Sequence, residues 1–220
     1  MPYKTSRFWR MIGVAGVLAM LAATPEISQA QLPPIPPIPP IPPIPPLPIG
    51  DPTPTLTGQA SAVTAVVFGN VISIVDTGTL SSASDPLGTS ESIVSMSGFA
   101  AEALQAATMA WSDQVASEAS LGNMALTLAG TTISADFIMS RALAVSGAGG
   151  SGLTDIEGLL IGGVPISPTG VPNQSISLPG LNLTLNEQIQ SASGIVVNAL
   201  RIRTLDGLID VIIGSAKAGI

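Results

Sequence analysis

Proline occupies two of every three positions between Pro33 and Pro46, in a Pro-Pro-Ile repeat that runs on to Pro48. Proline fixes φ, lacks an N–H and restricts the residue before it, so this stretch fits neither a helix nor the centre of a sheet. The repeat instead predicts a polyproline II helix with three residues per turn. One apolar side chain per repeat then lies on a single edge: Ile35, Ile38, Ile41, Ile44 and Leu47. Such an edge can bind an aromatic-lined groove, but the composition favours a semi-rigid spacer over residues 31–56.

The residues before this spacer have the three-part pattern of a secretory signal peptide. Lys4, Arg7 and Arg10 precede an uncharged apolar stretch, and Ser28 and Ala30 place small residues at the −3 and −1 positions of a cleavage site. The apolar stretch is too short for a permanent membrane anchor. We therefore expect residues 1–30 to be a signal peptide and the protein to be secreted, at the cell surface or in the periplasm.

Charge and missing residue types restrict the chemistry of the exported part. Its four cations and thirteen acids give a net charge of −9, which disfavours binding to nucleic acid. The chain has no His and no Cys. Catalysis by Ser-His-Asp or Cys-His groups is therefore excluded, as are thiolate and imidazole metal sites. No cofactor is expected, and the domain at 57–220 is expected to be non-enzymatic.

The domain is expected to be all-β, because small and β-branched residues alternate with many Gly and Pro. Two apolar runs, Gln59–Phe68 and Val71–Thr77, flank Gly69-Asn70, a pair typical of a two-residue hairpin turn. Pairing about this turn places Val67 opposite Ile72. Both faces of the hairpin are largely apolar, which predicts a central position in a sheet. The polar residues 81–92 are expected to form a loop.

The C-terminal hairpin is more strongly indicated. Ile195–Leu205 and Leu208–Ala216 flank Asp206-Gly207, which predicts a type I′ turn. The resulting register opposes Ile202 to Val211 and Leu200 to Ile213 on a core face. It places Asn198 and Ser215 on that same face. The other face is expected to carry an ion pair between Arg203 and Asp210, with Arg201 one diagonal step away.

A weak repeat runs between the two hairpins. Gly98, Gly130 and Gly163 end similar apolar runs and lie 32 and 33 residues apart. This spacing keeps a β-solenoid open as an alternative, although gaps between the copies favour hairpins in an antiparallel β-sandwich. The alanine-rich segment Phe99–Val115 is ambiguous. Its helical stripe of Leu104, Ala107, Trp111 and Val115 favours a helix, whereas its likeness to Ile133–Ile138 favours a strand, which we predict.

From Ser117 onward the sequence resembles the choice-of-anchor P family of bacterial exported proteins. The resemblance rests on the order of several short motifs, among them Gly130-Thr131-Thr132-Ile133, Gly170-Val171-Pro172-Asn173-Gln174, Leu183-Thr184-Leu185-Asn186-Glu187-Gln188 and Val197-Asn198-Ala199-Leu200. It implies export and a surface role. Members differ in their C-terminal sorting signals, and since Ala218-Gly219-Ile220 shows none, we expect no transmembrane anchor. Arg201 stands where the family often has a histidine, so the resemblance implies no reaction.

Few polar residues are candidates for a site. Asp155 and Glu157 are two residues apart and share a strand face, so they could act as acid and base on a glycoside. Together with Asp206 and Asp210 they could also supply calcium ligands, although solvated acids are the simpler interpretation. A polar cluster that either binds a ligand or satisfies backbone groups is expected from Asn173, Asn186, Glu187, Gln188 and Asn198.

The leading hypothesis from the sequence is a non-enzymatic surface structural or adhesion domain on a proline-rich spacer. Its expected partner is a cell-wall or extracellular matrix component. The alternative is a secreted carbohydrate-active enzyme that uses paired carboxylates.

Overall fold

The computed structural model describes residues 55–83 and 86–220. The predicted signal peptide at 1–30 and almost all of the spacer at 31–56 lie outside the described residues. The described part of the chain contains strands and no helix, so none of its segments is a helix that could span a membrane.

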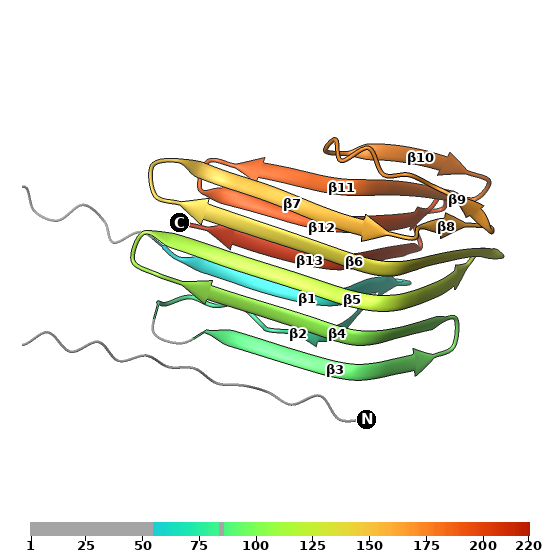
Figure 1. Cartoon of the computed structure of the whole chain (residues 1–220), viewed down its shortest axis with the longest axis horizontal. Helices are drawn as coiled ribbons and strands as arrows, with labels where there is room; N and C mark the ends of the chain where they lie inside the picture. The colour runs from blue at the N-terminus through green and yellow to red at the C-terminus, as the bar shows by residue number, and fades with distance from the viewer. Residues whose placement is uncertain (1–54, 84–85) are drawn as a thin grey trace, which may run out of the picture. The chain divides into compact units, whose positions relative to one another are not determined.

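Two antiparallel sheets pack face to face (Figure 1). Sheet A has the order β10-β11-β12-β13-β1-β2, and its strands are Gln174–Leu178, Leu181–Ser191, Gly194–Thr204, Ile209–Gly219, Thr57–Val67 and Asn70–Asp76. The first and last long strands of the domain, β1 and β13, are therefore neighbours. The antiparallel sandwich predicted from the sequence is confirmed, and the solenoid alternative is wrong because every strand pair in the described residues is antiparallel.

Sheet B contains the strands from the middle of the chain. Its order starts with β3 (Leu87–Met96), β4 (Phe99–Ala110), β5 (Gln114–Leu128) and β6 (Thr131–Val145). One half of β6 pairs with β7 (Gly149–Glu157), and the other half pairs with the short β8 (Leu160–Ile161), which in turn pairs with β9 (Val164–Pro165). Within the segment Phe99–Val115, residues 99–110 form β4, residues 111–113 turn the chain and β5 begins at Gln114. The prediction of a strand rather than a helix is therefore confirmed for residues 99–110, whereas Val115 belongs to the next strand.

The first hairpin differs from its prediction in two respects. Its turn consists of Phe68 and Gly69, both at positive φ, so Val67 lies opposite Asn70 rather than Ile72. The pairing is shifted by two residues, which keeps Ala65, Val67 and Ile72 on one face. Val75, at positive φ, leaves the predicted face and is buried in the core. Strand β2 is an edge strand and not central, because in the described part of the chain sheet A ends with it. The predicted loop at 81–92 is also too long, since β3 already begins at Leu87.

A row of irregular residues crosses both sheets and interrupts the alternation of inward and outward side chains. In β12 the buried core positions run Ile195, Val197, Ala199 and then Leu200, Ile202, which is a shift of one residue. The row contains non-glycine residues at positive φ in several strands: Val75 and Asn186 in sheet A, and Ala103 and Asn123 in sheet B. Strands β3 to β6 are bent part-way along their length (Figure 1). Because neighbouring strands shift together, β12 and β13 keep one register on both sides of the row.

The interior consists of two apolar clusters. The larger one contains the bulkiest fully buried side chains, among them Leu104, Leu121, Met124, Ile133, Ile138, Leu183, Leu200, Ile202 and Ile213. The smaller one is built largely from small residues: Leu80, Ala110, Val115, Ala142, Ala144, Ile195, Val197, Ala216 and Ala218. The sheets approach closely near the smaller cluster, where a Cβ on Gly58 would lie 2.2 Å from Thr108 Oγ1. Alanine and glycine are therefore the residues that this close approach of the two sheets allows near the smaller cluster.

Buried hydroxyl groups separate the two clusters. Thr108 Oγ1 and Ser117 Oγ are 2.7 Å apart, and Ser117 donates to the backbone carbonyl of Lys217 at 2.6 Å. This second hydrogen bond joins β5 in sheet B to β13 in sheet A. It satisfies polar groups that would otherwise be costly to bury.

Candidate functional site

The C-terminal hairpin has the predicted register but a different turn. Ile202 lies opposite Val211 and Leu200 opposite Ile213, and all four are in the core as expected. Strand β12 ends at Thr204 and β13 begins at Ile209, so the loop has four residues. Within it, the Gly207 N–H donates to the Thr204 carbonyl, and only Gly207 has a positive φ. Asp206 therefore does not occupy a type I′ turn. Hydrogen bonds from the Thr204 hydroxyl and then from the Leu208 N–H lower the pKa of Asp206, so this acid serves the turn.

A cluster of two arginines and two acids covers part of the outer face of sheet A. Arg201 binds Asp210 through Nη2 at 2.6 Å and through Nε at 2.9 Å, and it binds Glu187 through Nη1 at 2.9 Å. Arg203 is farther from the same acids, at 3.3 Å from Glu187 and 3.6 Å from Asp210. The predicted pairing of Asp210 with Arg203 exists, but Arg201 is the closer partner. The hydrogen bonds to Asp210 raise the pKa of Arg201, so its charge persists over the accessible pH range.

Asn198 extends this charged cluster instead of facing the core. It lies opposite Ser215 as predicted, accepts a hydrogen bond from the Ser215 hydroxyl at 2.8 Å and donates to Glu187 at 2.6 Å. The one-residue shift between Ala199 and Leu200 moves Asn198 to the face that carries Arg201. The predicted face of Asn198 and Ser215 is therefore wrong, because strict alternation fails at this row.

The remaining residues of the predicted polar cluster form a separate network. Asn173 accepts a hydrogen bond from the Gln188 N–H at 3.0 Å, and its own N–H donates to the Asn186 carbonyl at 2.8 Å. The Asn186 side chain donates to the Gly170 carbonyl, and Gln188 donates to Asn186 and to the Gly152 carbonyl. Asn186, Glu187 and Gln188 lie within β11 rather than at its end. The network satisfies backbone groups and ties a loop to β11.

The acids considered for catalysis or calcium binding do not gather in one place. Asp155 and Glu157 are both exposed on β7, whereas Asp206 serves its turn and Asp210 binds Arg201. Within residues 55–83 and 86–220, no three acidic side chains come together in a group that could hold a metal ion.

Removing Arg201 should test the charged cluster. Arg201→Met leaves Glu187, whose side chain is 11% exposed, and Asp210 with weaker partners. We expect the free energy of unfolding to fall by about 1–3 kcal/mol, less than for a fully buried pair because water still reaches Arg201. Arg141→Met is the matched control, since its pair with Glu118 is exposed and should contribute less than about 1 kcal/mol. Equal losses in urea unfolding of the two variants would contradict this account.

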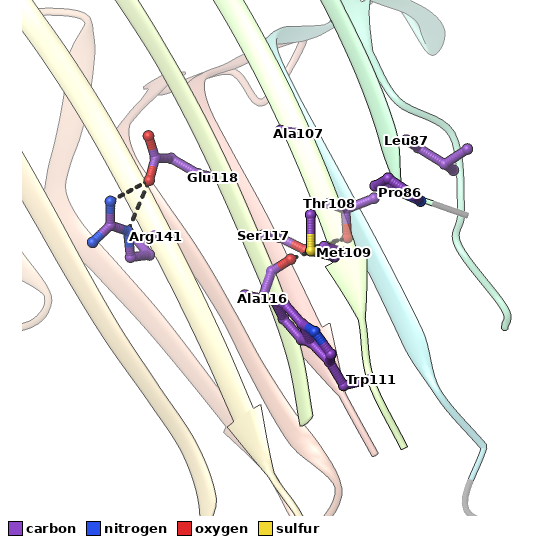
Figure 2. Close-up of a pocket in the computed structure, with 10 residues that line it drawn as sticks. All are labelled: Pro86, Leu87, Ala107, Thr108, Met109, Trp111, Ala116, Ser117, Glu118 and Arg141. Carbon is purple, nitrogen blue, oxygen red and sulfur yellow. Dashed lines mark hydrogen bonds and ion pairs between the residues drawn. The ribbon is translucent and has the colours of Figure 1, made fainter. Parts of the chain in front are cut away.

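A shallow apolar groove of about 230 Å³ lies on sheet B, and sequence reasoning missed it (Figure 2). Trp111, which is 41% exposed, and Met109 stand beside Ala107 and Ala116, which contribute only methyl groups. Pro86 and Leu87 line the groove from the β3 side. The ion pair of Glu118 and Arg141, with Nε to Oε2 at 2.8 Å, lies beside the groove. The strand pattern would have placed Trp111 on the outer face, but its place in an apparent helical stripe obscured that.

Comparison with protein-family models, with curated proteins and with solved structures finds no significant match to this chain.

Proposed function

We propose that this chain is an exported, non-enzymatic protein that serves as a surface structural or adhesion module. The charge and hydropathy pattern of residues 1–30 supports export, and the proline repeat supports a spacer between the cell and the domain. The resemblance to the choice-of-anchor P family supports a surface role. The protein is then secreted and works at the cell surface or in the periplasm.

The observation that carries this proposal is the groove around Trp111. Tryptophan is enriched among the residues that dominate binding energy, and exposed apolar surface commonly marks an interaction site. An indole face can stack against an apolar ring face, and Glu118 and Arg141 beside it supply hydrogen-bond acceptors and donors. This combination suits a cell-wall or extracellular matrix component that presents both ring faces and polar groups.

Trp111→Ala should weaken binding without unfolding the domain. Calorimetric titration of the purified exported protein and of the variant with cell-wall polysaccharides and matrix components measures the two affinities. We expect the variant to lose roughly tenfold or more in affinity, as at a hot spot. Its melting temperature should hardly change, because the side chain is 41% exposed.

Phe68→Ala is the matched control, because Phe68 is 68% exposed and lies outside the groove. The Phe68→Ala variant should bind the component with the same affinity as the unchanged protein. Unchanged binding by Trp111→Ala would reject the groove as the site. Release of sugar from a glycan that is abolished by Asp155→Asn or Glu157→Gln would instead favour the carbohydrate-active enzyme.

A further inference from the structure

A second cavity, of about 230 Å³, opens between the two sheets at one corner of the sandwich. Strands β1, β2 and β13 line it from sheet A, and the β3–β4 hairpin and the end of β5 line it from sheet B. The corner lies where edge strands β2 and β3 face each other, so the sheets are not covered there by further strands. The cavity is separate from the groove around Trp111, since the two share no lining residue.

The lining of this corner cavity is almost entirely hydrocarbon. Val67, Ile72 and Ile74 contribute from sheet A, and Met96, Phe99 and Leu128 contribute from sheet B. Among the described residues, Ser97 and Thr127 are the only polar side chains in the lining, and both are uncharged. Such a lining offers water few hydrogen-bond partners and offers an apolar ligand close contacts. A ligand that enters the cavity must therefore be apolar.

Exposed apolar side chains occur in the lining of the corner cavity and in the turns that adjoin its strands. The β1–β2 turn lies beside the C-terminal loop, since the Phe68 N–H donates to the Leu208 carbonyl at 2.9 Å. Phe68, Leu205 and Leu208 are all exposed there, and Ile72 and Met96 of the lining are each about half exposed (48% and 47%). Apolar side chains that are exposed next to an apolar cavity are a recognised mark of a ligand-binding groove.

Size and charge identify the occupant. An engineered apolar cavity of about 150 Å³ binds benzene, so this cavity, about half as large again, has room for part of an alkyl chain. None of the four cations among the described residues lines the cavity, so it offers no partner for a carboxylate or phosphate. We infer that the corner cavity binds the hydrocarbon chain of an uncharged lipid-like molecule, such as an aliphatic alcohol or ester, with the chain end inserted between the sheets.

The inference is tested by calorimetric titration of the full exported protein with 1-decanol and with decanoate. We expect saturable binding of one molecule of 1-decanol. Decanoate should bind roughly tenfold more weakly or worse, because its carboxylate would lose water at the mouth without gaining a partner. Absence of saturable 1-decanol binding would overturn the inference.

A variant that fills the cavity locates the binding. Ala65→Leu adds a branched side chain to the lining and should reduce 1-decanol affinity by roughly tenfold without lowering the melting temperature. Ala107→Leu makes the same change in the Trp111 groove and should leave 1-decanol binding unaltered. Equal binding by Ala65→Leu and the unchanged protein would overturn the assignment to this cavity.

A second variant remains informative if Ala65→Leu disturbs folding. Ile72→Lys places an ammonium group at the half-exposed mouth, where it can reach solvent. It should bind decanoate more tightly than 1-decanol, reversing the preference of the unchanged protein. An unreversed preference would overturn the inference. So would a concentration-dependent dimer that does not bind 1-decanol, or flotation with phosphatidylcholine vesicles without binding of free 1-decanol.

Discussion

Gly214→Val is expected to destabilise the domain by roughly 2–6 kcal/mol, combining backbone strain with overpacking of the core. Gly214 lies in β13 at φ 63°, a conformation that a β-branched residue strongly resists. A Cβ there would also lie 3.3 Å from Ala199 Cβ and 3.4 Å from Ile138 Cγ2, so the new side chain would press on both sheets. Urea unfolding followed by circular dichroism measures the loss.

Two control variants separate the causes of this loss. Gly130→Val has a similar φ of 78° but no atom within 4 Å of its added Cβ, so it should show only the strain, about 1–3 kcal/mol. Gly88→Val lies in edge strand β3 without positive φ and with room for a side chain, so it should be almost neutral. If Gly214→Val were no worse than Gly88→Val, the row of positive-φ residues would not be a feature of the folded protein.

Leu200→Ala is expected to cost roughly 2–5 kcal/mol, through the lost transfer free energy and the cavity that it leaves. Leu200 is fully buried in β12, opposite Ile213, and it belongs to the larger apolar cluster. The surrounding side chains come from both sheets, so the site cannot collapse without moving one sheet against the other. The measurement is again the free energy of unfolding in urea.

Leu205→Ala is the matched control for that prediction, because the same atoms are removed from a side chain that is 70% exposed. Its effect on unfolding should lie within about 0.5 kcal/mol of zero. A comparable loss at both positions would mean that the register of the C-terminal hairpin, and with it the inward face of β12, is incorrect.

Local sequence patterns were sufficient to predict the C-terminal hairpin. Asp206-Gly207 marks the turn, and the apolar pairs on both sides are satisfied together by one register only, so Leu200 and Ile202 are assigned to the core. The type of turn was mispredicted, because the Asp206 carboxylate is held by Thr204 and Leu208 within a longer loop. Contacts of a few atoms decide between such turns, and residue preferences do not resolve them.

The charged cluster depends on strand neighbours that no local signal reveals. Glu187 reaches Arg201 because β11 pairs with β12 through a turn at residues 192–193, which lacks a Gly or Asn signal. The Trp111 groove was missed for a related reason. From Leu104 to Ala110 strand β4 alternates regularly between buried and exposed side chains, and Trp111 follows it as an exposed residue. The apparent helical stripe joined buried Leu104 with exposed Ala107 and Trp111, which lie on opposite faces.

The sequence by itself determined the all-β class, the hairpins and the core positions of the C-terminal strands, because alternation and turn residues act over a few neighbours in the chain. Only the tertiary structure decided that β2 is an edge strand, that Asn198 joins Glu187 on the outer face and that an apolar cavity opens at one corner. These features arise where strands distant in sequence meet. The one-residue shift at Ala199 and Gly214 is tolerated only because neighbouring strands shift together, and that cooperation is a property of the sheet as a whole.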